Sequence, residues 1–139
     1  MFCDLVGSTA LSEQLDPEEW RAIVQDYQAA CGEKISRFEG YIAQCLGDGL
    51  LVYFGYPAAH EDDAQRAVRA GLEIVEAIRG QGSGVGGQEK RQHLNARLSQ
   101  SLQVRVGIHT GQVVVGAIGG GEKREHLALG DTPNIAARV

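Results

Sequence analysis

The sequence predicts an α+β fold in which helices pack on one face of a mostly antiparallel sheet. Two long segments repeat apolar residues at three- and four-residue steps, which is the period of an amphipathic helix. Shorter apolar runs end at glycine-containing turns, which is typical of strands and of one tight hairpin. Along the chain these elements follow as a strand, two helices, two strands, a helix, a loop, further strands and a last helix.

The chain begins with a short strand that leads directly into a helix. Residues 2–5 form an apolar run broken by one acid, and residues 6–9 have the pattern of a strand end followed by a helix start. After Asp16, a candidate N-cap, apolar residues recur with helical spacing. Proline is favoured at the first position of a helix. We therefore expect a long amphipathic helix from Pro17 to about residue 40.

The next segment has the signature of a β-hairpin followed by another helix. Apolar runs at residues 41–46 and 50–54 flank the tight turn Gly47-Asp48-Gly49. The second run is apolar at every position, so we expect that strand to be buried on both faces. Residues 62–79 then predict an amphipathic helix. Its expected buried stripe consists of Ala64, Ala67, Val68, Gly71, Ile74, Val75 and Ile78.

The last third of the chain predicts further strands and a final helix. Residues 104–108 and 113–118 are apolar runs separated by a polar turn, and residues 127–129 form a shorter run. Thr132 is expected to cap the last helix and Pro133 to begin it.

Length and composition suit a single globular domain. The 139 residues include 43% hydrophobic residues, and a chain of this size can bury a core of its own. Residues 80–101 are rich in glycine and then polar, which is the composition of a flexible loop. We therefore expect one domain over residues 1–139 with this loop inside it.

Charge and cysteine content exclude several classes of protein. Thirteen Lys and Arg against 18 Asp and Glu leave a formal net charge of −5, which disfavours nucleic acid and anionic lipid as partners. No window approaches the roughly 20 apolar residues of a membrane span, and no signal peptide opens the chain, so we expect a cytoplasmic location. Cys3, Cys31 and Cys45 lack CxxC spacing, so we expect neither a disulfide nor a zinc site, but reduced, mostly buried thiols.

Two aspartates stand out because of their surroundings. Asp4 lies in an apolar run, where an unpaired carboxylate costs several kcal/mol, so it either has a partner or faces solvent on an edge strand. Asp48 lies between two glycines at the hairpin tip, either as a residue with positive φ or where the backbone approaches a ligand. A strand-end acid and a hairpin-tip acid together are typical of palm-type nucleotide-transfer sites, whose carboxylates suit Mg²⁺ or Mn²⁺.

Two further segments carry residues suited to phosphate and ribose. The segment Val6-Gly7-Ser8-Thr9 begins a helix shortly after Asp4, so the free N–H groups of that helix could bind a triphosphate, or the hydroxyls could simply cap the helix. Asn134 and Arg138 lie four residues apart and share one helix face. An amide and a guanidinium there could hold a ribose oxygen and a reacting phosphate, or form a solvated face.

An acidic segment, His60-Glu61-Asp62-Asp63, lies at the expected start of the second long helix. Its residue types could form a metal cluster. Acids that open a helix also accept hydrogen bonds from its free N–H groups and favour its dipole. We therefore prefer the capping interpretation.

Four segments of the chain resemble the catalytic domain of class III adenylate and guanylate cyclases. They are the sequences FCDLVGST at residues 2–9, LGDGL at 46–50, VGIHTG at 106–111 and GDTPNIAAR at 130–138. They occur in the order of the family and span nearly the whole chain. The resemblance implies a ferredoxin-like, palm-type sheet and an enzyme that converts ATP to 3′,5′-cyclic AMP and pyrophosphate in intracellular signalling.

The resemblance also implies roles for individual residues. Two Mg²⁺ or Mn²⁺ ions per site would be held by Asp4, Asp48 and the backbone carbonyl of Val6. The triphosphate would be cradled by Gly7, Ser8 and Thr9. Asn134 would orient the ribose, and Arg138 would stabilise charge at the α-phosphate. In the family these two sets come from different chains, which implies a head-to-tail homodimer with two sites.

The sequence departs from the family pattern at the positions that bind the purine. Gln44 and Leu127 stand where adenylate cyclases carry Lys and Asp or Thr, and where guanylate cyclases carry Glu and Cys. The Gln amide can both donate and accept hydrogen bonds, so it could pair with adenine or, rotated, with guanine. ATP is the preferred substrate, because relaxed discrimination between the bases costs less than inverted discrimination, and GTP is not excluded. The alternative is a degenerate cyclase homology domain that binds nucleotide or a partner domain and regulates without turnover.

The resemblance also bears on the length of the protein. The last strands of the family lie beyond Val139, and the first strand lacks its beginning, so we expect the chain to be a fragment. The segment that begins at Gly55 resembles bacterial members with additional regulatory domains, which we expect in the intact protein.

Overall fold

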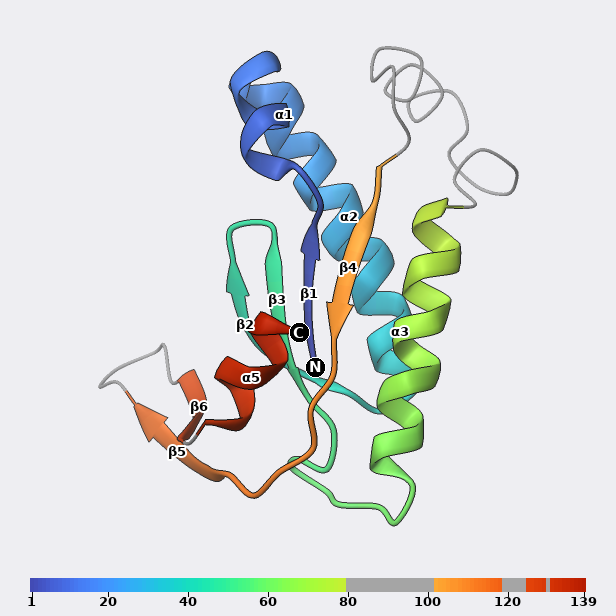
Figure 1. Cartoon of the computed structure of the whole chain (residues 1–139), viewed down its shortest axis with the longest axis vertical. Helices are drawn as coiled ribbons and strands as arrows, with labels where there is room; N and C mark the ends of the chain where they lie inside the picture. Colours follow the sequence, from blue (N-terminus) through green and yellow to red (C-terminus); the bar gives the residue numbers. More distant parts are fainter. Residues whose placement is uncertain (80–101, 119–124, 130) are drawn as a thin grey trace.

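A four-stranded antiparallel sheet forms the centre of the structure (Figure 1). The computed structural model describes residues 1–79, 102–118, 125–129 and 131–139, so the predicted loop at 80–101 lies outside the described residues. The sheet has the order β2-β3-β1-β4, which places the first strand of the chain in its interior. Its strands are β1 (Phe2–Leu5), β2 (Tyr41–Leu46), β3 (Gly49–Tyr53) and β4 (Val104–Gly107).

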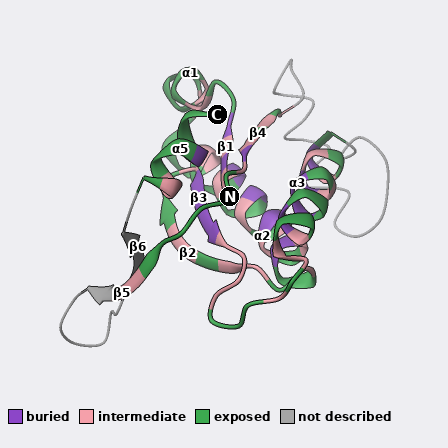
Figure 2. Ribbon diagram, turned by 60° about the horizontal axis from the view of Figure 1, so that its bottom comes forward, coloured by how far each residue is buried: buried purple, intermediate pink, exposed green. Residues whose placement is uncertain are grey.

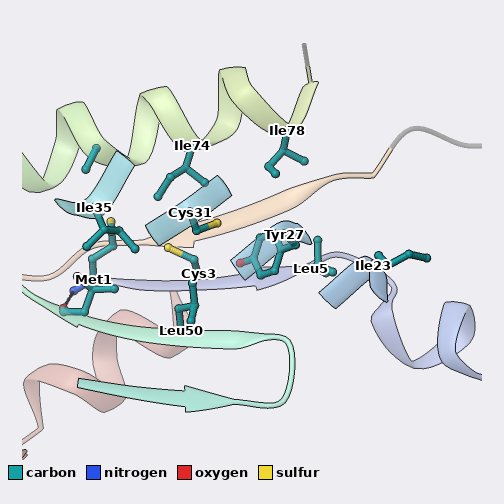
Figure 3. Packing of buried hydrophobic residues seen from close by; sticks show 12 residues of the cluster. Met1, Cys3, Leu5, Ile23, Tyr27, Cys31, Ile35, Leu50, Ile74 and Ile78 are labelled. Atoms are coloured by element: carbon teal, nitrogen blue, oxygen red, sulfur yellow. Dashed lines mark hydrogen bonds between the residues drawn. The ribbon is translucent and has the colours of Figure 1, made fainter. Parts of the chain in front are cut away.

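Two long helices, α2 (Pro17–Arg37) and α3 (Asp63–Arg79), cover one face of this sheet (Figures 1 and 2). A shorter helix, α1 (Ser8–Gln14), follows β1 and contacts α2. The α+β class with an antiparallel sheet is confirmed. The core fills the space between the helices and the sheet (Figure 3); its buried residues are Met1, Cys3, Leu5, Ile23, Tyr27, Cys31, Ile35, Leu50, Val52, Ala70, Ile74 and Ile78.

The last helix, α5 (Thr132–Arg138), contacts β1 and β4 on the opposite face from α3. Side chains alternate along a strand, and a Cβ on Gly71 of α3 would lie 3.2 Å from the Val106 side chain. The next residue, Gly107, faces α5, and a Cβ there would overlap the carbonyl oxygen of Ala136. The absence of a side chain at Gly107 therefore lets α5 lie directly on the sheet.

Two further strands, β5 (Val114–Ile118) and β6 (Glu125–Leu129), form a separate antiparallel pair. Their register places Gly116 opposite Leu127, and β6 contacts β2. This pair therefore extends the fold beside the outer strand of the main sheet.

Several predicted boundaries shift by one residue. The long helix begins at Pro17 after Asp16, as predicted, but α3 begins at Asp63 and not at residue 62. The prediction that Thr132 caps the last helix is wrong, because Asp131 is the N-cap and Thr132 is already helical. On α3, Val68 is 48% exposed, whereas Ala70 is fully buried in the core. The buried face of α3 is therefore rotated relative to the predicted one and includes Ala70 in place of Val68.

The thiols differ in their surroundings. Cys3 and Cys31 are fully buried, and burial is the main reason that the pKa of each rises to about 12. Cys45, on β2, is exposed. The expectation of mostly buried, unpaired cysteines is therefore confirmed.

We predict that at about pH 8 a thiol reagent labels only Cys45 in the folded chain, because thiolates are the reactive species. Buried thiols with raised pKa values stay protonated and shielded. Mass spectrometry after labelling checks this, and unfolding in urea should make all three cysteines reactive. Rapid labelling of Cys3 or Cys31 in the folded chain would contradict the predicted packing.

We also predict that Gly107→Ala lowers the free energy of unfolding by about 1–3 kcal/mol, because the added methyl group pushes α5 off the sheet. The matched control is Gly32→Ala in the middle of α2, where a Cβ would lie 3.8 Å from the Ile42 side chain. That change should stabilise by about 0.5–1 kcal/mol through helix propensity. Urea unfolding measures both, and equal stability of the two variants would contradict the described α5 contact.

Candidate functional site

The turn between β2 and β3 brings Asp48 to the end of β1. Leu46 pairs with Gly49, so the turn consists of Gly47 and Asp48. One carboxylate oxygen of Asp48, Oδ2, accepts a hydrogen bond from the backbone N–H of Leu5 at 3.2 Å. Leu5 directly follows Asp4, so this bond joins the hairpin tip to the strand that carries the other aspartate.

The alternative interpretation of Asp48 as the positive-φ residue of the turn is wrong. Gly47 has that conformation, with φ of 63°, which suits a turn with glycine at its first central position. Asp48 is therefore free to direct its carboxylate toward β1. The Asp48 side chain contacts β1, whereas Gly47 provides the backbone conformation that the turn requires.

Asp4 has a charged partner that sequence reasoning did not identify. Asp4 pairs in register with Arg105 of β4, whose guanidinium donates from Nε to Oδ1 at 3.2 Å and from Nη2 to Oδ2 at 2.6 Å. This contact with Asp4 also raises the pKa of Arg105. Since β1 is an interior strand, the alternative of a solvent-facing acid on an edge strand is wrong. The expectation that Asp4 needs a partner is confirmed.

The helix that follows β1 begins without a side-chain cap. Gly7 is the N-cap of α1, in a left-handed conformation, and no side chain caps the helix. The alternative of a simple Ser8 or Thr9 N-cap is therefore wrong. The N–H of Val6 donates to the carbonyl of Gln103 at 2.9 Å, which extends the pairing of β1 with β4. The free N–H groups in the first turn of an uncapped helix can bind anions by donating hydrogen bonds to them.

The predicted transition-state pair lies on α5. Asn134 and Arg138 are four residues apart on this helix and both are exposed. Within the described parts of the chain, no hydrogen bond or ion pair joins either residue to Asp4 or Asp48. The fold thus gathers Asp48 and the end of β1, while the helix pair stays unattached to them.

The two positions expected to bind the purine lie on neighbouring strands. Gln44 is partly buried on β2, next to a bulge that leaves Ala43 without a partner between the pairs Ile42 with Val52 and Gln44 with Leu51. Leu127 lies on β6, which contacts β2. The two positions therefore lie on strands that contact each other.

The acidic residues at the start of α3 form hydrogen bonds and an ion pair with residues close to them in the sequence. Asp63 accepts a hydrogen bond from the His60 backbone N–H at 2.7 Å, and Asp62 pairs with Arg66 at 2.8 Å. Across the described ranges of the chain, no three His, Cys, Asp or Glu residues are grouped so that they could hold a metal. The alternative of a metal cluster here therefore has no support.

The same finding bears on Asp4 and Asp48. A cation held by two carboxylates needs further oxygen ligands from backbone, water or phosphate, which is how Mg²⁺ usually binds with a nucleotide. The donor set of carboxylates with nearby backbone groups fits such an ion. The thiols and imidazoles that would favour zinc are not part of it.

A cavity of about 350 Å³ is lined by the last residues of β3 and the segment that follows that strand. Tyr53, Tyr56, Asp63 and Thr132 are among the residues that line it, whereas Asp4, Asp48, Asn134 and Arg138 are not. The candidate catalytic residues therefore lie outside this cavity.

Comparison with known proteins identifies the family of this chain. The family model described as the adenylate and guanylate cyclase catalytic domain matches residues 1–139. The chain is 32% identical to adenylate cyclase 1 of Rhizobium meliloti over 139 residues, which is all of this chain and 20% of that protein. It resembles the crystal structure of the guanylyl cyclase Cya2 with a TM-score of 0.84 and 36% identity, covering 99% of this chain and 65% of that one.

A second solved structure, the adenylyl cyclase CyaB from P. aeruginosa, gives a TM-score of 0.83 at 28% identity and covers 99% of this chain and 67% of that one. The chain thus spans about a fifth of the first curated relative and about two thirds of the similar crystal structures. Among the described residues, no helix has the length and apolar character needed to cross a membrane. On the family match and the shared fold, the chain belongs to the family of adenylate and guanylate cyclase catalytic domains.

Proposed function

We propose that the chain converts ATP to 3′,5′-cyclic AMP and pyrophosphate with two Mg²⁺ or Mn²⁺ ions. The observation that carries this proposal is the hydrogen bond from the Leu5 N–H to the Asp48 carboxylate, which ties the hairpin tip to the strand of Asp4. This bond supports the proposal that two carboxylates from distant parts of the chain serve one nucleotide site.

Asp4, Asp48 and the carbonyl of Val6 would hold the metal ions in this proposal. When bound, divalent ions lower the pKa of the ribose 3′-hydroxyl and offset the negative charge of the phosphates. The backbone N–H groups of Gly7, Ser8 and Thr9 would bind the triphosphate at the uncapped start of α1. No covalent nucleophile is required, since the attacking group belongs to the substrate.

Asn134 and Arg138 complete the proposed site from a second copy of the chain. The Asn134 amide orients the ribose, and the Arg138 guanidinium stabilises charge that develops at the α-phosphate. Both residues are exposed on α5, so a second chain can reach them. We propose a head-to-tail homodimer with two equivalent sites.

The base and the regulatory setting are also proposals. The Gln44 amide can hydrogen-bond either adenine or, rotated, guanine, and Leu127 offers only shape. We propose ATP as the substrate, because relaxed discrimination between the bases costs less than inverted discrimination, and GTP is the second candidate. Because the chain spans about a fifth of a relative's length, we propose that further regulatory domains accompany this domain in a cytoplasmic signalling protein.

A second candidate function is a regulatory module that binds nucleotide or a partner domain without turnover. The observation that favours it is the pair Gln44 and Leu127 at the purine positions, where neither family pattern is met. The presence of Asp4, Asp48, Asn134 and Arg138 together argues for turnover, because a module that only binds has no need for all four.

One assay distinguishes these functions. The intact protein that contains this chain is purified and incubated with Mn²⁺ and either ATP or GTP, and cyclic nucleotide and pyrophosphate are quantified. Formation of cyclic AMP from ATP supports the proposal. Formation of cyclic GMP from GTP, with no product from ATP, would show that the substrate is GTP. Nucleotide binding with no product from either substrate would contradict turnover and favour the regulatory module.

We predict that Asp48→Asn lowers cyclase activity by roughly 10²- to 10³-fold, because the neutral amide binds a divalent ion much more weakly than a carboxylate does. An Asn oxygen can still accept the Leu5 N–H, so the turn should keep its place. The matched control is Asp26→Asn, an exposed carboxylate on α2, which should leave activity unchanged. Full activity of a folded Asp48→Asn chain would refute the metal assignment.

The homodimer predicts complementation between two inactive variants. Asp48→Asn and Asn134→Ala damage different halves of each site, so every mixed dimer contains one intact site and one doubly damaged site. Random mixing of equal amounts should restore about a quarter of wild-type activity, since half of the dimers are mixed and each has one working site. No recovery, with mixed dimers verified by two affinity tags, would contradict a shared site.

A further inference from the structure

We propose that Arg105 is an internal counter-ion that competes with the divalent cation for Asp4 and thereby weakens metal binding by the free chain. This inference rests on the proposed role of Asp4 as a metal ligand. It assigns to Arg105 a positioning role, because the residue acts through the carboxylate.

The contact between Arg105 and Asp4 uses both carboxylate oxygens. The two residues lie directly opposite each other on β1 and β4, so the backbone pairing sets the position of the guanidinium. Its Nε donates to Oδ1 at 3.2 Å and its Nη2 donates to Oδ2 at 2.6 Å. A cation that uses either oxygen must therefore displace the guanidinium or lie beside a positive charge.

The two aspartates of the proposed site differ in this respect. Asp48 accepts a backbone N–H and, among the described residues, has no ion pair. A backbone donor is electrically neutral as a group and does not repel an incoming cation. Of these two aspartates, only Asp4 already forms an ion pair before a metal ion binds. We therefore expect Asp4 to limit the affinity of the site for the metal ion.

Exposure shows that the guanidinium is able to leave. The Arg105 side chain is 63% exposed, whereas that of Asp4 is 20% exposed. An exposed bidentate pair contributes little to stability and can open into solvent at small cost. Asp4 is held in place by its interior strand, so Arg105 is the partner that moves. Its guanidinium can dissociate from the Asp4 carboxylate and bind it again.

Binding of Mn²⁺ alone, followed by electron paramagnetic resonance of the free ion, tests this inference without enzymatic turnover. Arg105→Ala and Arg105→Gln should each tighten Mn²⁺ binding by about three- to tenfold, because the competing charge is gone. Arg105→Lys keeps a charge without the fork and should change the affinity less. Circular dichroism and urea unfolding verify that each variant is folded.

The matched control is Arg37→Ala. Arg37 is 65% exposed and also forms an ion pair, with Glu73 at 3.0 Å, but on the helical layer. It removes the same charge from the chain, so an unchanged Mn²⁺ affinity there separates a local effect from net charge. Equal tightening by Arg37→Ala and Arg105→Ala would overturn the inference.

Asp4→Asn separates this inference from the proposed function. Loss of Mn²⁺ binding in Asp4→Asn together with tighter binding in Arg105→Ala supports both. Loss in Asp4→Asn with unchanged affinity in both Arg105→Ala and Arg105→Gln overturns the counter-ion and leaves the metal site standing. Unchanged binding in Asp4→Asn, or no Mn²⁺ binding by wild type and every variant, overturns the metal site and the inference with it.

Discussion

The candidate site depends on one hydrogen bond between distant parts of the chain, from the Leu5 N–H to the Asp48 carboxylate. This bond requires that β1 lie beside β3 and that the turn between β2 and β3 be short enough to aim Asp48 inward. Gly47 provides that turn by adopting a positive φ. Without this geometry the two aspartates would belong to separate surfaces, and no common ligand could link them.

The strand order explains why charged side chains from two neighbouring segments lie close to β1. An interior strand has neighbours on both sides, so Asp4 lies between the Asp48 turn of one neighbour and Arg105 of the other. The helical layer buries Cys3 and Leu5, and the alternation of a strand turns Asp4 to the other face. The fold therefore stabilises the site from one face and leaves the other for ligand and for α5.

Sequence patterns predicted the features that local chemistry controls. The start of α2 at Pro17 and the hairpin around Gly47 follow from proline, glycine and apolar spacing, and both are present. The pairing of Asp4 with Arg105 could not be predicted, because the two residues are 101 positions apart and their register depends on packing of the whole sheet. The close fit of Gly107 against Ala136 likewise becomes visible only once α5 is placed. The metal-binding, substrate-binding and catalytic roles of individual residues all remain predictions, those of Asp4 and Asp48 included.

The central claim is that Asp4 and Asp48 hold divalent cations at the end of β1. A crystal structure of the chain with Mn²⁺ and a non-cyclisable ATP analogue, with anomalous scattering recorded for manganese, tests it most directly. We expect anomalous peaks within coordination distance of both carboxylates, with the triphosphate at the start of α1. Bound nucleotide with manganese at any other location, and none at these carboxylates, would contradict it.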